Sequence, residues 1–386
     1  MQKNEKTTVP NPSVGAEGEQ SQVKTDNEIV AGLWEESNAF DEEPAESTDS
    51  MLEEMERMSD PAYLPTVSMN ELYERVYDGR PPIIGGLLYT GTYLFVGAPK
   101  VGKSFLMAQL AYHVSTGQPF WGYPVRQGTV LYLALEDDYR RLQERMFRMF
   151  GVESTPNLHF AVDAKQIGTG LYDQLRKFVK EHPDTKLVII DTLQKVREAG
   201  SEKYSYASDY EIVGQLKRFA QGLGLCLLLV HHTRKQQADD AFDMISGTNG
   251  LLGAADGAFM LQKEKRTENK ATLEIAGRDQ PEQKLYLLKD QQRLTWEIER
   301  AEAELWKAPP DPILETVAHL MAERSEWIGS PTELAENLSV EMKPNALTRH
   351  LNVKASELKT EHGILYTNKP RHHGRQISLT KMEVEG

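Results

Sequence analysis

Cysteine and long apolar runs are scarce in this 386-residue chain. The single cysteine, Cys226, excludes an internal disulfide, and its place within an apolar run predicts a small buried side chain. No apolar run in the sequence approaches the length that a helix needs to cross a bilayer. The first twelve residues contain no apolar stretch of the signal-peptide type. We therefore expect a cytoplasmic protein.

Basic residues are scarce at the start of the chain, where acidic ones gather. Residues 1–60 contain 16 Asp and Glu against 4 Lys and Arg, which accounts for −12 of the net charge of −14. Such a segment buries too little apolar surface to offset chain entropy, so we expect residues 1–62 to be an acidic disordered tail. The alternative is a short partner-binding helix near Trp34 and Phe40, with a replication protein as its partner. The nearly neutral remainder does not exclude nucleic-acid binding.

A glycine-rich stretch stands between a strand-like run and a helix-like run. Gly97 and Gly102 allow the backbone to bend so that N–H groups point at phosphate oxygens, and the following helix adds the positive end of its dipole. The pattern predicts a P-loop, in which Lys103 reaches the β- and γ-phosphates and the Ser104 hydroxyl holds Mg²⁺. ATP and Mg²⁺ are therefore the expected cofactors, and the competing interpretation is a glycine turn without a ligand. The expected nucleotide contacts are Gly97, Ala98, Pro99, Lys100, Val101, Gly102, Lys103, Ser104 and Phe105.

Strand-like and helix-like runs alternate from the P-loop onward, as βαβ units require. Continuous apolar runs are typical of parallel strands covered on both faces, and the shorter runs after Gly247 favour antiparallel strands. A capping-box pattern at Ser68 and Glu71 predicts a short helix that opens this domain. We expect an α/β fold over residues 63–305, with a mostly parallel sheet and late antiparallel strands. The expected strands are 92–96, 129–135, 158–162, 187–190, 225–230, 258–262, 271–276, 284–288 and 294–298, and the expected helices are 103–115, 137–150, 171–181 and 208–221.

Acidic residues follow two of the expected strands. Asp191 ends an apolar run that we place beside the P-loop strand, where its carboxylate would hold Mg²⁺ or a water on it. The competing role is a cap of the next helix. Glu136 ends another strand, where a carboxylate can orient and deprotonate the water that attacks the γ-phosphate. Asp137 and Asp138 adjoin it, and we favour Glu136 as the base.

Basic and imidazole groups follow the later strands. His231 and His232 come after the run 225–230, where a polar side chain can contact the γ-phosphate and report its hydrolysis. Arg278 follows a late strand and is a candidate arginine finger, which a neighbouring subunit would supply to stabilise charge on the γ-phosphate. The alternative for Arg278 is a solvated side chain paired with Asp279. Lys289 is the second candidate for the finger.

Three prolines within residues 309–312 forbid a continuing helix and mark a linker over residues 306–312. Beyond it, residues 313–386 contain three helix patterns. Two short strands follow, Ile364–Thr367 and Gln376–Leu379, which bracket a basic loop. This order of elements is that of a winged-helix domain, an extension of the helix-turn-helix.

The motifs of residues 63–300 together resemble the RecA-type ATPase core, and more narrowly the RepA-type replicative helicases of plasmids and mobile elements. This resemblance implies a RecA-like fold and hexameric rings that hydrolyse ATP at subunit interfaces and move along single-stranded DNA. The tail and the winged helix go beyond the minimal helicase. The resemblance also implies P-loop, metal, base, sensor and finger roles for Lys103, Ser104, Glu136, Asp191, His232 and Arg278. The motifs that carry the resemblance are Gly97–Ser104, Leu133–Asp137, Val188–Thr192, Leu229–His232, Ser246–Thr248 and Ala254–Asp256.

Basic side chains in two regions are candidates for nucleic-acid contact. In a RecA-type ring, the loops after the Asp191 and His232 strands face the central channel, where basic and aromatic residues suit a single strand. In the winged helix, the third helix and the hairpin would meet duplex or forked DNA. Mobile solvated loops and a protein partner are the respective alternatives. The candidates are Lys195, Arg197, Arg234 and Lys235 in the loops and Arg349, Lys354, Lys369, Arg371 and Arg375 in the winged helix.

Three functions compete for these features. The favoured one is an oligomeric, Mg-ATP-dependent DNA helicase or translocase of a mobile element. The alternative is a DNA-binding ATPase switch that recruits replication, transposition or recombination partners without unwinding. A small-molecule kinase is disfavoured, because no second substrate pocket is evident in the sequence.

Overall fold

The computed structural model describes residues 56–77, 79–197, 206–233, 241–245, 249–263, 265, 267–278, 280, 282–303, 310–371 and 374–382. The chain forms two compact units. The larger consists of residues 78–311, and the smaller combines residues up to 77 with residues 312–386. Most of the expected acidic tail and residues 306–309 of the expected linker lie outside the described residues.

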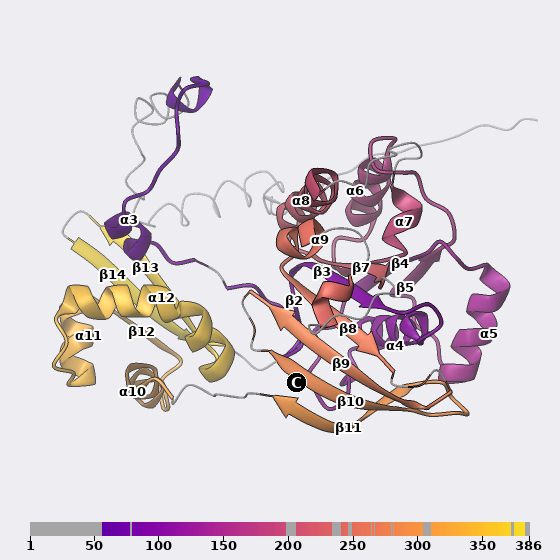
Figure 1. The fold of residues 1–386 in the computed structure, drawn as a ribbon. Coiled ribbons are helices and arrows are strands. Elements are labelled where there is room, and N and C mark those ends of the chain that lie inside the picture. Colours follow the sequence, from indigo (N-terminus) through magenta and orange to yellow (C-terminus); the bar gives the residue numbers. More distant parts are fainter. Residues whose placement is uncertain are drawn as a thin grey trace, which may run out of the picture. The chain divides into compact units, whose positions relative to one another are not determined.

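In the described part of the larger unit, nine strands form one sheet in the order β11-β10-β9-β8-β3-β7-β6-β4-β5 (Figure 1). Strands β8 to β5 in this order are parallel, whereas β9, β10 and β11 run antiparallel. The expected α/β fold with late antiparallel strands is therefore confirmed. The strands of this unit are β1 (Pro82–Ile84), β2 (Leu88–Tyr89), β3 (Gly91–Gly97), β4 (Thr129–Ala134), β5 (Leu158–Ala161), β6 (Thr185–Asp191), β7 (Cys226–His232), β8 (Gly257–Gln262), β9 (Lys270–Gly277), β10 (Gln283–Lys289) and β11 (Trp296–Ala303).

Two details of the sheet differ from the expectation. Strand β8 pairs with β3 in parallel, so the antiparallel part begins one strand later than predicted. Strand β7 lies between β3 and β6, so Asp191 does not end a strand beside the P-loop strand. An apolar run indicates that a strand is buried, but it contains no information about which strand lies next to it.

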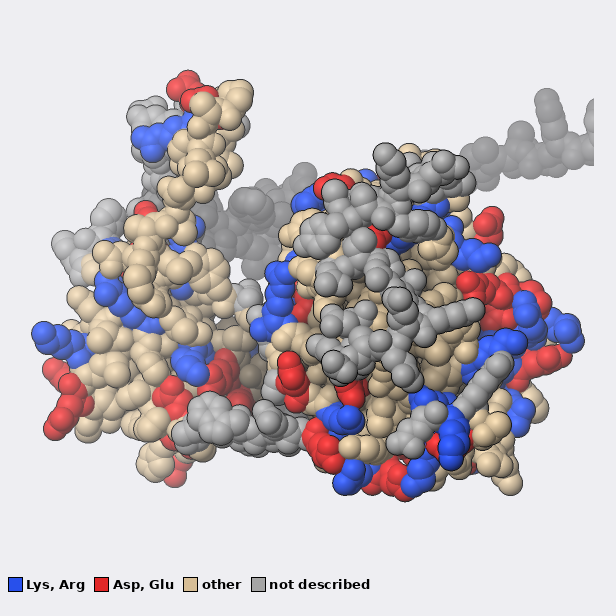
Figure 2. Space-filling model, viewed as in Figure 1, with Lys and Arg blue, Asp and Glu red and all other residues tan. Residues whose placement is uncertain are grey.

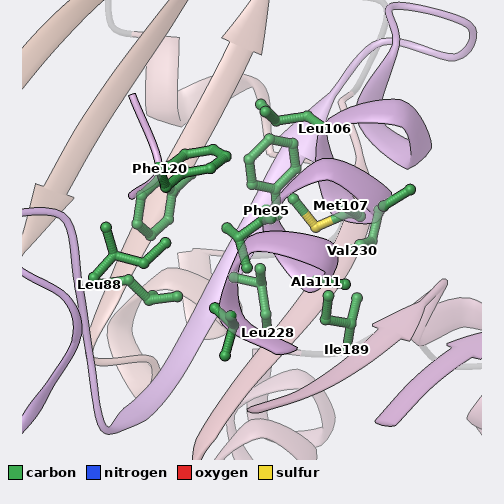
Figure 3. Close-up of a cluster of buried hydrophobic side chains, with 14 of the residues drawn as sticks. Leu88, Phe95, Leu106, Met107, Ala111, Phe120, Ile189, Leu228 and Val230 are labelled. Atoms are coloured by element: carbon green, nitrogen blue, oxygen red, sulfur yellow. The ribbon is translucent and has the colours of Figure 1, made fainter. Parts of the chain in front are cut away.

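Helices cover both faces of this sheet (Figure 1). On one face, α4 and α5 pack over the strands, and side chains of α4 such as Leu106 and Met107 interleave with Phe95, Ile189 and Leu228 (Figure 3). The other face is covered by α6, α7, α8 and α9. The helices are α4 (Lys103–Thr116), α5 (Tyr139–Phe150), α6 (Leu171–Glu181), α7 (Leu193–Val196), α8 (Tyr206–Leu223) and α9 (Asn249–Ala254), with a 3₁₀ turn η2 at Ala241–Met244.

The smaller unit has its own apolar core. Its described C-terminal part follows the order helix, strand, helix, helix, strand, strand, with an antiparallel sheet in the order β12-β14-β13. We expected the helices and the hairpin but not β12, and the hairpin strands extend through most of the basic loop that we placed at residues 369–375. The elements are α10 (Pro312–Leu320), β12 (Glu326–Gly329), α11 (Pro331–Leu338), α12 (Pro344–His362), β13 (Ile364–Arg371) and β14 (Gly374–Lys381).

The capping box at Ser68 and Glu71 forms as expected and opens α3 (Met69–Glu74). Its position differs from the expectation, because α3 belongs to the smaller unit and not to the α/β unit. The Asn352 amide donates a 2.9 Å hydrogen bond to the Tyr73 carbonyl oxygen, and Val76 packs against the core of the smaller unit. A capping box determines where a helix starts but not what it packs against.

None of the helices in the described residues is long and apolar enough to span a membrane.

Candidate functional site

The P-loop joins β3 to α4 at the carboxyl edge of the parallel strands. Gly102 adopts a left-handed conformation with φ 114° and is the N-cap of α4, without a side-chain cap. A Cβ at Gly102 would lie 2.8 Å from the Trp296 ring, and one at Gly97 would lie 2.5 Å from the Leu261 carbonyl oxygen. Both glycines are therefore required by close packing, and the uncapped helix start offers N–H groups to an anion.

The Lys103 ammonium lies within this loop. It donates hydrogen bonds to the carbonyl oxygens of Gly97 at 2.8 Å and Ala98 at 3.1 Å, and it lies 3.2 Å from Nδ1 of His232. Burial lowers the pKa of Lys103 to about 8, although the negative charges of Asp191 and Glu136 act in the opposite direction. A buried cation whose hydrogen bonds go only to neutral groups is suited to receive a phosphate.

Asp191 is buried at the end of β6. Its carboxylate accepts a 2.9 Å hydrogen bond from the Tyr132 hydroxyl and another from the Ser104 hydroxyl. Burial raises the pKa of Asp191, which these two hydrogen bonds oppose. Ser104 and Asp191 thus bring two side-chain oxygens together that could hold Mg²⁺, since a nucleotide-bound Mg²⁺ takes few ligands from the protein and the rest from phosphate and water. No cluster of three His, Cys, Asp or Glu side chains in the described residues forms a metal site by itself.

The structure separates the roles of the three acidic residues after β4. Asp137 forms ion pairs with Arg141 and Arg145, and Asp138 is the N-cap of α5, where its carboxylate also pairs with Arg141. Glu136 accepts a 3.3 Å hydrogen bond from the Thr192 hydroxyl and lies close enough to Lys103 to influence its pKa. Acidic and basic side chains lie next to one another around α5 (Figure 2). Glu136 is thus the carboxylate that faces the P-loop.

His232 ends β7 opposite Gly97 of β3 in the sheet register. Burial and the neighbouring Lys103 lower the pKa of His232, so its neutral ring accepts from the ammonium at Nδ1. A phosphate that draws Lys103 away would break this contact. His231 is the buried neighbour whose side chain, by strand alternation, points to the other face.

The two finger candidates lie at opposite ends of the strands: Arg278 at the amino-terminal end of the parallel strands and Lys289 at their carboxyl-terminal end. Arg278 follows β9 at the end where Gly277 pairs with Gly257, and its guanidinium donates to the Gly253 carbonyl oxygen at 2.6 Å. This end of the strands is opposite the end that carries the P-loop of the same chain. Lys289 lies instead beside its own P-loop helix, with its ammonium 4.0 Å from the centre of the Phe105 ring.

Two aromatic residues of the site were missed by the sequence analysis. Trp296 packs its ring against Gly102, and Gln109 of α4 binds both backbone groups of Trp296. Tyr132 binds Asp191. Tyr132 lies in an apolar strand, and Trp296 begins a strand in which apolar and charged residues alternate, and neither pattern indicates these contacts.

The candidate DNA contacts of the larger unit are only partly described. Lys195 is exposed on α7. Arg197 is 7% exposed and forms an ion pair with Asp209 of α8 at 3.0 Å. This burial argues against DNA contact by Arg197, and we remove it from the proposed set. Arg234 and Lys235 lie outside the described residues.

The candidate contacts of the smaller unit lie on α12 and the hairpin. Arg349 is exposed, and Lys354 pairs with Glu357 one turn along the same helix. The hairpin residues are on strands rather than in a loop, with Lys369 and Arg371 on β13 and Arg375 on β14. Arg375 forms an ion pair with Glu74 of α3 at 2.8 Å.

Comparisons with known proteins give one family and a set of structures. The profile of a family described as "AAA domain" matches residues 58–238. A solved structure whose title describes an ATPase domain is 16% identical with a TM-score of 0.46, and the match covers 72% of this chain and 99% of that one. A structure titled "The Structure Of A DnaB-Like Replicative Helicase And Its Interactions With Primase" is 18% identical with a TM-score of 0.46, over 71% of each chain. Comparison with curated protein sequences gives no significant match.

Proposed function

We propose that this protein is a Mg²⁺-dependent ATPase that acts on DNA as a ring-forming helicase or translocase of the RepA type. One observation carries the proposal: four side chains meet around the P-loop from α4 and from the ends of three parallel strands. They are Lys103, Glu136, Asp191 and His232. The family match over residues 58–238 supports the ATPase assignment.

Each of these side chains has a role in hydrolysis. Lys103 and the N–H groups at the start of α4 bind the β- and γ-phosphates. Ser104 and Asp191 hold Mg²⁺, which neutralises phosphate charge when bound. Glu136 orients the attacking water and takes its proton, and His232 senses the γ-phosphate through Lys103. No acceptor other than water is needed.

The proposed active assembly is a ring, with a hexamer favoured. Arg278 lies at the end of the strands opposite its own P-loop, so only a neighbouring copy can bring it to a γ-phosphate. Lys289, beside its own Phe105, is better placed to contact the nucleotide of the same chain. We therefore assign the trans finger to Arg278.

DNA binding is proposed for both units. In the larger unit, Lys195 and the segment that contains Arg234 and Lys235 would contact a single strand. The order of elements in the smaller unit supports a winged helix, with Arg349, Lys354, Lys369, Arg371 and Arg375 as its DNA contacts. A separate core and a basic helix–hairpin surface also favour the second candidate function, an ATPase switch that recruits partners on DNA without unwinding.

A forked DNA substrate separates the two functions. We expect strand displacement that requires both ATP and Mg²⁺, with release of inorganic phosphate and no phosphorylated acceptor. ATPase activity that single-stranded DNA stimulates without any displacement would assign the switch instead. The Lys103→Ala variant is the control, because it removes the phosphate-binding ammonium while leaving the DNA-binding residues in place.

The affinity for ATP should fall as the pH rises above 8. The ammonium form of Lys103 binds phosphate, and its pKa of about 8 means that the site loses this charge with increasing pH. The nucleotide phosphates are already ionised in this range. We expect the Kd for Mg-ATP to increase by up to about tenfold per pH unit above 8. Lys103→Arg, which stays charged, should show a flat profile between about pH 7.5 and 9.5, and parallel profiles for the two proteins would contradict the prediction.

A further inference from the structure

Helix α3 covers part of the surface between α12 and the β13–β14 hairpin. Its last turn makes three polar contacts there. The Tyr73 carbonyl oxygen accepts from the Asn352 amide at 2.9 Å. The Glu74 carbonyl oxygen and carboxylate accept from the two terminal nitrogens of Arg375 at 3.3 and 2.8 Å.

The groups beneath α3 are donors with fixed directions. Asn352 is 1% exposed, and its carboxamide oxygen accepts from the Tyr366 hydroxyl at 2.9 Å and from the Asn368 amide at 3.1 Å. These two bonds turn the amide nitrogen of Asn352 toward α3. Beside it, Arg375 on β14 presents a guanidinium. The surface is therefore built to receive acceptors.

Helix α3 presents acceptors and negative charge to this surface. The carboxyl end of a helix carries unpaired carbonyl oxygens and partial negative charge, and Glu74 adds a carboxylate. A row of oxygen acceptors with negative charge is also what the phosphodiester backbone of a nucleic acid offers.

We propose that α3 is an internal competitor for a nucleic-acid backbone, which binds to Asn352 and Arg375 in its place. The proposal rests on the DNA-binding role suggested above for the smaller unit and adds its regulation. Displacement of α3 exposes these two donors, in addition to Arg349, Lys369 and Arg371, which are already exposed.

The attachment of α3 is suited to release. The helix has six residues, none of them buried, and helices of this length are marginal without packing. The ion pair between Glu74 and Arg375 is partly exposed, with side-chain exposures of 47% and 33%, so screening keeps it weak. Beyond the polar contacts, Val76 packs against the core of the unit.

The test uses the full chain and a fluorescein-labelled DNA duplex at low ionic strength. Glu74→Ala removes the competing carboxylate, so a larger fraction of the molecules should have α3 displaced. We therefore expect the Kd for the duplex to fall by about fivefold. Glu315→Ala, which removes an exposed charge from α10 in the same unit, is the matched control and should change affinity by less than about twofold. The gain should vanish in Glu74→Ala/Arg375→Ala, because the donor is then missing.

A second readout follows α3 itself. Added duplex should increase backbone hydrogen exchange in residues 69–74 of the unmodified chain, which a purely structural helix would not show. Equal affinities for Glu74→Ala and Glu315→Ala, or slower exchange with DNA, would overturn the proposal. If a peptide of residues 66–77 binds the Glu74→Ala chain and the duplex does not, the surface belongs to a protein helix and the nucleic-acid assignment is wrong. ATP turnover in the same samples tests the ATPase assignment separately.

Discussion

Replacing Glu136 by glutamine is expected to lower ATP turnover by about 10²–10⁴-fold while leaving nucleotide binding nearly unchanged. The amide keeps the size of the side chain and can still accept from the Thr192 hydroxyl, but it cannot take a proton from water. Lys103, Ser104 and Asp191, which hold the phosphates and Mg²⁺, are untouched. Steady-state phosphate release and equilibrium binding of a fluorescent ATP analogue measure the two effects.

The neighbouring acids provide matched controls. Asp138→Asn keeps a good N-cap for α5 and should retain turnover within about threefold. Asp137→Asn weakens the ion pairs with Arg141 and Arg145 and should lower the free energy of unfolding. Its turnover per folded molecule should stay close to that of the unmodified chain. If the Glu136→Gln protein turns over normally and one of these two controls does not, the base is misassigned.

Replacing Asp256 by alanine is expected to lower the free energy of unfolding by about 3–5 kcal/mol, because two partly buried cations and the Thr92 N–H lose their buried partner. The carboxylate of Asp256 has no exposed surface, pairs with Lys217 at 2.8 Å and Arg80 at 2.9 Å, and accepts from the Thr92 N–H at 2.9 Å. It joins α8, the start of β3 and the segment before β1, at the end of the strands opposite the P-loop. Urea denaturation followed by circular dichroism measures the change.

The control for Asp256 is an exposed ion pair. Glu299→Ala removes the partner of Lys270 on the sheet surface and should change stability by less than about 1 kcal/mol. Burial tends to raise the pKa of Asp256, but hydrogen bonds from Lys217, Thr92 and Arg80 outweigh it and hold the pKa below its ordinary value. The stability that Asp256 contributes is therefore fully present at pH values above the ordinary pKa of an aspartate, and it is lost as the pH falls through the lowered pKa. Equal stability of Asp256→Ala and the unmodified chain at neutral pH would contradict this account.

The sequence predicted the strands of the sheet more completely than their order. β3, β6 and β7 are buried on both faces, so their apolar runs were visible without a structure. Which strand lies beside β3 depends on how the helices cross over, and the separation of β6 from β3 by β7 was missed for that reason. β12 was missed because its residues alternate between exposed and half-buried and include no fully buried side chain.

Prediction of individual site residues failed where the partner was distant or hidden. The motif placed Lys103 and Ser104 in the P-loop, since that geometry is local. Arg197 looked like a DNA contact, because nothing in its own segment indicated that Asp209 would bury it. Among the acids at 136–138 the sequence favoured Glu136, and the structure adds that Asp137 and Asp138 form ion pairs with Arg141 and Arg145.

The smaller unit is assembled from both ends of the chain, and this has a consequence for how the protein is made. Tyr73 and Asn352 are 279 positions apart, and Glu74 and Arg375 are 301 apart. During synthesis, α3 leaves the ribosome long before its partners exist, while the α/β unit can already fold as a domain. Closing so long a loop adds little further entropy cost, but it makes the docking of α3 one of the last folding steps. A ribosome-bound chain that stops before residue 344 should therefore display α3 undocked and accessible to proteases.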